Sequence, residues 1–133
     1  MPSMHDRDII QRLAAETAEI AALPVQEETR RMWRKLNGLT PERPMVMIDQ
    51  VCWNEMNVDD ELTLACEDEE CRRFEDLLRR QLYQWRHFRL DMVIEPFIRV
   101  PMAIQNAGFG LSAKAHMAES DSDGIIGRSF DNQ

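Results

Sequence analysis

Apolar residues recur every three or four positions over residues 6–22, which predicts an amphipathic helix. The apolar stripe consists of Ile9, Leu13, Thr17 and Ile20. The charged residues expected on its solvent side are Asp6, Arg7, Arg12, Glu16 and Glu19. Leu23-Pro24 then interrupts the pattern, because proline cannot donate to the preceding turn but suits the first turn of a new helix. We expect a second helix to about Asn37, closed by Gly38 in the left-handed conformation, so that the two helices form a hairpin or a bent pair.

Residues 67–88 carry the clearest helical pattern of the chain. Its apolar face consists of Phe74, Leu77, Leu78, Leu82 and Trp85. An acidic first turn and a basic last turn complement the helix dipole. Four acid–base pairs have i,i+4 spacing, worth about 0.2–0.5 kcal/mol each, and this gives the charges a structural role. These pairs are Asp68–Arg72, Glu69–Arg73, Glu75–Arg79 and Asp76–Arg80.

Short apolar runs outside these helices are typical of strands. Residues 62–66 could instead lead into the following helix, and Pro96 should interrupt the strand that contains it. The segments expected as strands are 44–48, 62–66, 91–100, 111–118 and 125–130. The predicted fold class is therefore α+β: a helical hairpin, one long amphipathic helix and a small mixed or antiparallel sheet. A single domain is expected over 1–133, with a helical part at about 6–38 and an α/β part at about 44–133.

Composition narrows the class of protein. With 44% apolar and 30% charged residues, the 133-residue chain is typical of a globular domain. No apolar run approaches the roughly 18 residues of a membrane span, and the polar N-terminus is unlike a secretory signal, so a cytoplasmic location without membrane binding is expected. A net charge of −8 would repel nucleic acid, since the arginines between Arg72 and Arg89 are interleaved with acids.

The chain has three cysteines, at positions 52, 66 and 71, and an odd count in a chain without a secretory signal argues against a disulfide framework. Cys66 and Cys71 are separated by four residues, whereas a zinc knuckle typically separates its paired cysteines by two. We expect reduced structural thiols and no metal site.

Polar and aromatic residues follow the expected strand at 44–48. The weak candidates are Asp49 and Glu55 for catalysis, and Trp53 and Asn57 for substrate binding. Two carboxylates beside an aromatic ring in a loop held by rigid structure could bind a cation or act as acid and base. The alternative is a surface loop whose acids cap the following turn.

Two further residues are weak candidates for a site. Glu95 interrupts an apolar run and could be a buried catalytic carboxylate with a raised pKa, or an outward-facing residue of an edge strand. His87 could contact a substrate, or could interact with the terminal carbonyls of its helix.

Three stretches resemble a known class of enzyme. They are Glu-Ile-Ala-Ala-Leu-Pro-Val-Gln-Glu-Glu at 19–28, Arg-Pro-Met-Val-Met-Ile-Asp-Gln-Val-Cys-Trp-Asn-Glu-Met-Asn-Val-Asp-Asp-Glu-Leu at 43–62, and Tyr-Gln-Trp-Arg-His at 83–87 leading to Asp-Met-Val-Ile-Glu-Pro-Phe at 91–97. Together they are similar to the opening section of uroporphyrinogen decarboxylase-like proteins, a class that includes corrinoid-dependent methyltransferases. The resemblance runs over nearly the whole chain, and 43–62 is its most specific part.

The resemblance implies a longer enzyme. The catalytic unit of the class is a (β/α)₈ barrel, which needs at least about 200 residues, so this chain would be the N-terminal section that precedes or flanks the barrel. The chain stops directly after a strand-like segment, which is expected of a section cut from a longer protein. The implied role is a contribution to the active-site wall or to a dimer contact, without catalysis by the section alone. The alternative is a stand-alone acidic protein-interaction module.

The sequence also departs from the class. The decarboxylases carry an arginine motif near the N-terminus, ending in a Gln-Ala-Gly-Arg-type tetrapeptide, that grips substrate carboxylates. The comparable place after Pro44 reads Met-Val-Met-Ile-Asp-Gln-Val-Cys-Trp and contains no arginine. In the methyltransferases, a zinc site of His and Cys ligands lies far downstream, and no cysteine of this chain matches it. The resemblance thus implies no cofactor in this chain. For the full-length enzyme it implies a zinc ion as cofactor. The implied partners are the barrel, a second copy of the chain and a corrinoid protein.

Overall fold

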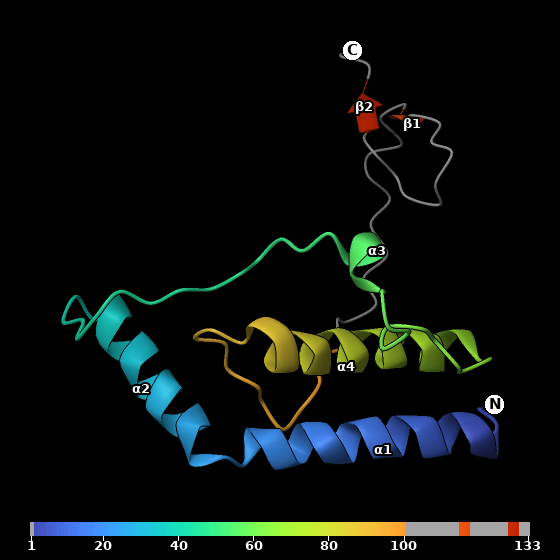
Figure 1. Cartoon of the computed structure of the whole chain (residues 1–133), viewed down its shortest axis with the longest axis horizontal. Helices are drawn as coiled ribbons and strands as arrows, with labels where there is room; N and C mark the ends of the chain where they lie inside the picture. The colour runs from blue at the N-terminus through green and yellow to red at the C-terminus, as the bar shows by residue number, and fades with distance from the viewer. Residues whose placement is uncertain (1, 101–114, 118–127, 131–133) are drawn as a thin grey trace, which may run out of the picture. The chain divides into compact units, whose positions relative to one another are not determined.

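The computed structural model describes residues 2–100, 115–117 and 128–130. The chain divides into two units, Met1–Ile98 and Arg99–Gln133. The described part of the first unit contains four helices, α1 Met4–Ala21, α2 Pro24–Asn37, α3 Trp53–Met56 and α4 Glu69–Phe88 (Figure 1). In the second unit, β1 Ala115–Met117 and β2 Arg128–Phe130 pair antiparallel, with Ala115 opposite Phe130.

The prediction of an α+β fold is wrong. Residues 44–48, 62–66 and 91–100 are not strands, and the first unit is helical wherever it has regular structure. An apolar run becomes a strand only when a neighbouring backbone forms a ladder with it. Here the N–H of Val46 donates instead to the Asp91 carboxylate, at 2.8 Å. β1 and β2 lie within two segments expected as strands, but three residues in each cannot supply the sheet layer of an α+β domain.

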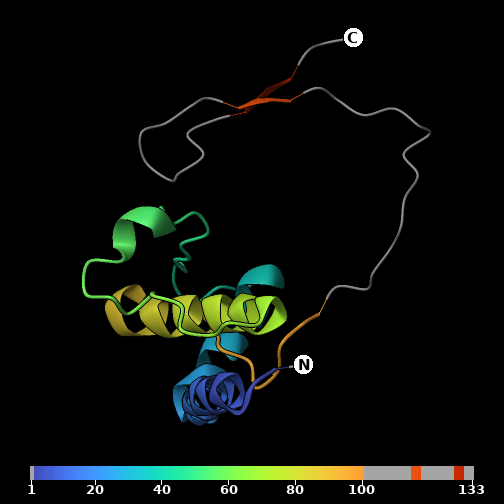
Figure 2. The same cartoon turned by 90° about the vertical axis from the view of Figure 1, so that its right-hand side faces the viewer.

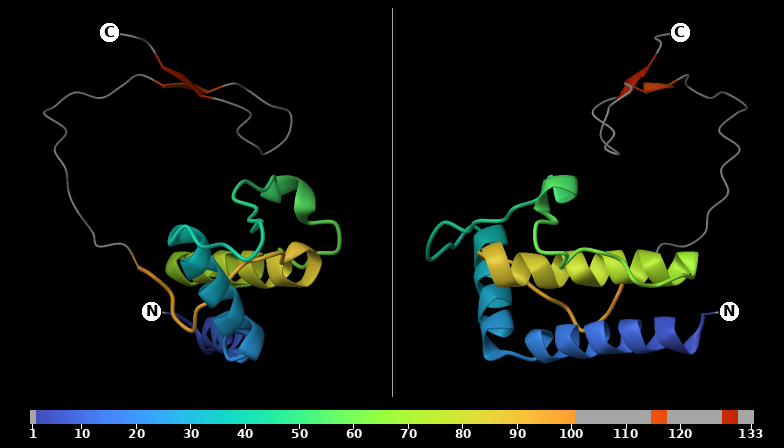
Figure 3. Two further views of the ribbon diagram at one scale, coloured as in Figure 1. Left: turned by 90° about the vertical axis from the view of Figure 1, so that its left-hand side faces the viewer. Right: turned by 45° about the vertical axis from the view of Figure 1, so that its right-hand side comes forward.

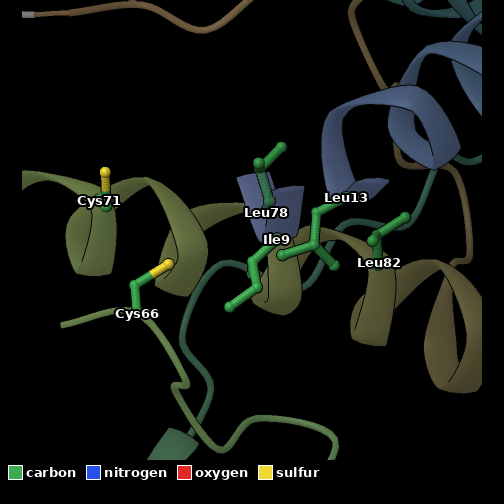
Figure 4. Close-up of a cluster of buried hydrophobic side chains, with 6 residues drawn as sticks. All are labelled: Ile9, Leu13, Cys66, Cys71, Leu78 and Leu82. Carbon is green, nitrogen blue, oxygen red and sulfur yellow. The ribbon is translucent and has the colours of Figure 1, made fainter. Parts of the chain in front are cut away.

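The core lies between α1 and α4, which run in the same direction and cross at an angle (Figures 1 and 2). Ile9 and Leu13 of α1 lie opposite Leu78 and Leu82 of α4 (Figure 4). The buried positions of α1 follow the predicted stripe, except that Ile20 is half-buried and Ala21 is buried in its place. This arrangement buries apolar area that favours folding by about 25 cal/mol per Å².

Asp6 is a correction to the expected solvent face of α1, because its side chain is buried. Its carboxylate accepts hydrogen bonds from the backbone N–H groups of Glu67 at 2.9 Å and Asp68 at 3.3 Å. These bonds, led by that from Glu67, lower the pKa of Asp6. The carboxylate therefore joins the start of α1 to the residues that lead into α4.

α2 turns away from the end of α1 and passes the C-terminal end of α4 (Figure 3). Pro24 occupies its first turn, as predicted. The prediction that Gly38 adopts the left-handed conformation is wrong. Its φ is −84°, and Leu39 has the left-handed φ of 59° instead. Gly38 instead continues the helical hydrogen bonding, since its N–H donates to the Arg34 carbonyl at 2.9 Å. The left-handed residue after α2 therefore comes one position later than predicted.

α4 confirms the predicted long helix. It begins at Glu69, after Asp68, whose carboxylate accepts from the N–H groups of Glu70 and Cys71. Three of the four predicted pairs form at 2.8 Å: Glu69–Arg73, Glu75–Arg79 and Asp76–Arg80. Arg72 instead donates to the Cys66 carbonyl at 2.8 Å, because Asp68 is engaged as the helix cap. In the part of the chain that the structure describes, no helix has the length and apolar character needed to cross a membrane.

Candidate functional site

The candidate site residues lie on and beside the segment at residues 39–68, here called the return segment, which runs back from the end of α2 to the start of α4. Side chains of α4 hold it along its length. Gln84 donates to the Ile48 carbonyl at 3.4 Å, Tyr83 to the Met56 carbonyl at 3.1 Å, and Arg79 to the Glu61 carbonyl at 2.9 Å. The return segment does not pair with a strand within the described residues, so side chains of α4 position it instead.

An aromatic cluster, Trp53, Tyr83, His87 and Phe88, forms where α3 meets the end of α4. The ring centroid of Tyr83 lies 6.2 Å from that of Trp53 and 4.3 Å from that of His87. The Arg80 guanidinium lies 5.3 Å from the Trp53 centroid, a cation–π distance. Two of the predicted substrate-binding residues, Trp53 and His87, are therefore brought together through Tyr83.

Charges surround this aromatic cluster. A ring nitrogen of His87 lies 2.8 Å from one Glu61 oxygen, and Arg86 donates to the other at 2.9 Å. The His87 contact first, and then Arg86, lowers the pKa of Glu61. Arg86 also reaches Glu16 of α1 at 2.5 Å, so the network links three segments. His87 was predicted to interact with the terminal carbonyls of its helix, but its ring nitrogen contacts the Glu61 carboxylate of the return segment.

The other candidates on the return segment, Asp49, Glu55 and Asn57, lie on the surface. Asp49 and Glu55 are exposed, and neither forms an ion pair within the described residues. Asn57 has a local role, because its side chain accepts from the Leu62 N–H at 3.0 Å and donates to the Thr63 hydroxyl at 2.9 Å. The suggestion that two carboxylates near an aromatic ring bind a cation or act as acid and base stays a prediction.

Glu95, the third carboxylate candidate, is half-buried and lines a groove of about 700 Å³. The other groove residues come from α2, the return segment, α4 and the segment after it. They are Arg30, Trp33, Arg34, Asn37, Met47, Ile48, Gln84, Asp91, Met92 and Val93. The sequence pattern does not predict this groove, although Arg30 and Arg34 at i,i+4 in an amphipathic helix indicate a cationic edge.

Two of the three cysteines have the burial expected of structural thiols. Cys66 and Cys71 are buried in the core, and Cys52 is exposed. Burial, assisted by Glu75, raises the pKa of the Cys66 thiol to about 12. Within the described residues, no group of three or more His, Cys, Asp or Glu side chains is placed to hold a metal ion.

Comparisons with protein-family models, with curated proteins and with solved structures give no match for this chain.

Proposed function

We propose that this chain is the N-terminal section of a uroporphyrinogen decarboxylase-like enzyme. In this proposal it contributes to the active-site wall or to a dimer contact and is not catalytic alone. Of the two activities of the class, methyl transfer to a corrinoid is preferred, because residues 45–53 lack the arginine expected of a porphyrinogen decarboxylase. The remaining barrel would supply the zinc site, and a corrinoid protein would be the partner in the cytoplasm.

The observation that carries the proposal is that the three stretches with the resemblance meet in space. Arg43 of the second stretch pairs with Asp91 of the third. Gln26 of the first stretch accepts from the backbone N–H of Ile94 in the third, at 2.9 Å. Residues far apart in sequence therefore belong to one set of contacts, as expected if the stretches characterise a single structural section.

Exposed apolar side chains on the return segment give further support. Val46 is 50% exposed, Met47 is 64% exposed and Val58 is 82% exposed. A segment that carries apolar residues outside the core of its own unit is suited to pack against another part of a larger protein. This favours a section of an enzyme over an independent module.

The test is the natural reading frame and its product. We expect the frame to continue beyond Gln133 into a barrel-sized region. The purified full-length protein should convert cob(I)alamin to methylcobalamin with one member of a panel of methylated amines and methoxylated aromatics, followed by absorbance. A stop codon directly after Gln133 would overturn the proposal. The 133-residue chain would then be the stand-alone interaction module, monodisperse and without binding of the neutral dye Nile red.

A further inference from the structure

We infer that the groove beside α2 binds a small amphipathic carboxylate, with an apolar ring system in the groove and its carboxylate at Arg34 and Arg30. This inference goes beyond the proposed function and does not depend on it. The two arginines lie in α2. They are therefore distinct from the arginine motif of the decarboxylases, whose comparable place in this chain comes after Pro44.

The groove has the size and the apolar surface for such a ligand. Its volume of about 700 Å³ lies within the range of about 300–1,000 Å³ usual for small-molecule sites. Its apolar lining consists of Trp33, Met47, Ile48, Met92 and Val93. Met side chains adapt readily to the shape of a ligand.

The polar groups beneath this lining are already paired. The Trp33 indole N–H donates to the Asp91 carbonyl at 2.7 Å, and the Gln84 amide donates to the Ile48 carbonyl. The Asp91 carboxylate is neutralised by Arg43. An apolar ring can therefore enter without leaving these groups unpaired, which would otherwise cost about 1–3 kcal/mol for each buried group.

The α2 edge of the groove already holds a carboxylate. Glu27 lies between two arginines, with one oxygen 3.1 Å from Arg34 and the other 3.4 Å from Arg30. The hydrogen bond from Arg34 is the main cause that lowers the pKa of Glu27. The two guanidinium groups are therefore spaced to share one carboxylate.

A ligand can compete for Arg34 because its contact with Glu27 is open to solvent. Arg30 is 25% exposed and also donates to the Ile94 carbonyl at 3.3 Å. The Arg34 side chain is 69% exposed and that of Glu27 is 65% exposed. Exposed pairs of this kind contribute little, about 0–1 kcal/mol, so that Glu27 can turn into solvent when another carboxylate arrives. The acids of the groove lining are Asp91, which Arg43 neutralises, and Glu95.

The probe is 2-naphthoate, compared with its neutral analogue 2-naphthamide, in an NMR titration of the ¹⁵N-labelled 133-residue chain. The indole N–H of Trp33 reports on the groove, and those of Trp53 and Trp85 serve as internal controls outside its lining. We expect saturable shifts of the Trp33 signal, with naphthoate binding about three- to fivefold more tightly than naphthamide.

Variants separate a charge-selective site from general adhesion. Arg34→Gln should remove the preference for naphthoate, and Glu27→Gln should increase it by removing the carboxylate that now occupies Arg34 and Arg30. Arg73→Gln is the matched control, because Arg73 is 65% exposed and also pairs with exposed glutamates. Equal binding of the two probes, shifts confined to Trp53 or Trp85, an equal effect of Arg73→Gln, or no saturable binding would each overturn the inference.

Discussion

Arg43 and Asp91 form a bidentate ion pair across 48 positions of the sequence, with guanidinium–carboxylate distances of 2.6 and 2.9 Å. The backbone N–H of Val46 adds a third bond to the same carboxylate, at 2.8 Å. The Asp91 N–H in turn donates to the Val46 carbonyl at 3.2 Å. One aspartate therefore fixes the beginning of the return segment against the residues that follow α4.

This pair predicts how Asp91 titrates. The Arg43 hydrogen bonds first, and then the Val46 N–H, lower the pKa of Asp91 from 3.8 to about 2. A lowered pKa means that the ionised carboxylate stabilises the folded state above pH 3.8, and that this contribution is lost as the pH falls through about 2. In Arg43→Gln, the NMR titration midpoint of the Asp91 carboxyl carbon should move up toward 3.8.

The same variant should reduce the dependence of the free energy of unfolding on pH in the acid range, measured by urea denaturation. Arg73→Gln is the control, since its partners Glu69 and Glu70 are exposed and lie in its own helix. An unchanged Asp91 midpoint in Arg43→Gln would contradict the assigned cause of the shift.

Features decided by neighbours in the sequence were predictable. α4 and its three i,i+4 ion pairs follow from helical spacing alone, and so does most of the buried stripe of α1. The end of α2 was placed within one residue, but the left-handed position was assigned to Gly38 and not to Leu39. The error arises because the left-handed conformation usually favours glycine, whereas here a leucine, Leu39, adopts it.

Features decided by distant backbone groups were not predictable. Asp6 and Glu75 have the spacing of surface charges, yet both are buried because peptide N–H groups of residues 65–68 supply their partners. The apolar run at 44–48 indicates extended chain but not whether another strand pairs with it. At the candidate site, the association of Trp53 with His87 depends on Tyr83, which the pattern of polar residues did not identify.

Packing of α1 against α4 gives a second prediction. Leu78 is 1% exposed at the centre of this contact, and its neighbour Leu77 is 43% exposed. Leu78→Ala should lower the free energy of unfolding by about 2–5 kcal/mol, because it removes buried methyl groups and leaves a cavity. Leu77→Ala, measured by the same urea titration, should cost less than about 1 kcal/mol, since the side chain keeps much of its contact with water. The sequence pattern placed both leucines on the apolar face, so equal losses would contradict the contact face of α4 seen in the structure.

The cysteines should differ sharply in reactivity. Burial raises the pKa of both Cys66 and Cys71, whereas Cys52 is exposed. Because the thiolate is the reacting form, iodoacetamide at neutral pH should modify Cys52 alone in the folded chain and all three cysteines in denaturant. Mass spectrometry of digested protein gives the sites. Rapid native modification of Cys66 would show that the core around it opens readily.

Glu75 and Asp76 provide the most direct comparison of a buried and an exposed ion pair, since both bond an arginine at i,i+4 at 2.8 Å. The Glu75 side chain is 0% exposed and that of Asp76 is 36% exposed. Burial alone would raise the pKa of Glu75, but the N–H groups of Ala65 and Cys66, together with Arg79, lower it. The carboxylate is therefore the form that the fold requires.

Glu75→Gln keeps the volume of the side chain but turns one acceptor oxygen into an amide donor, which faces N–H groups that also donate. We expect the free energy of unfolding to fall by about 2–4 kcal/mol, because buried donors lose their acceptor. Asp76→Asn should cost only about 0.2–0.5 kcal/mol, as for other exposed helical pairs. Urea denaturation of both variants measures the difference. A similar small loss in both would show that Glu75 does not hold residues 65 and 66 against α4 in solution.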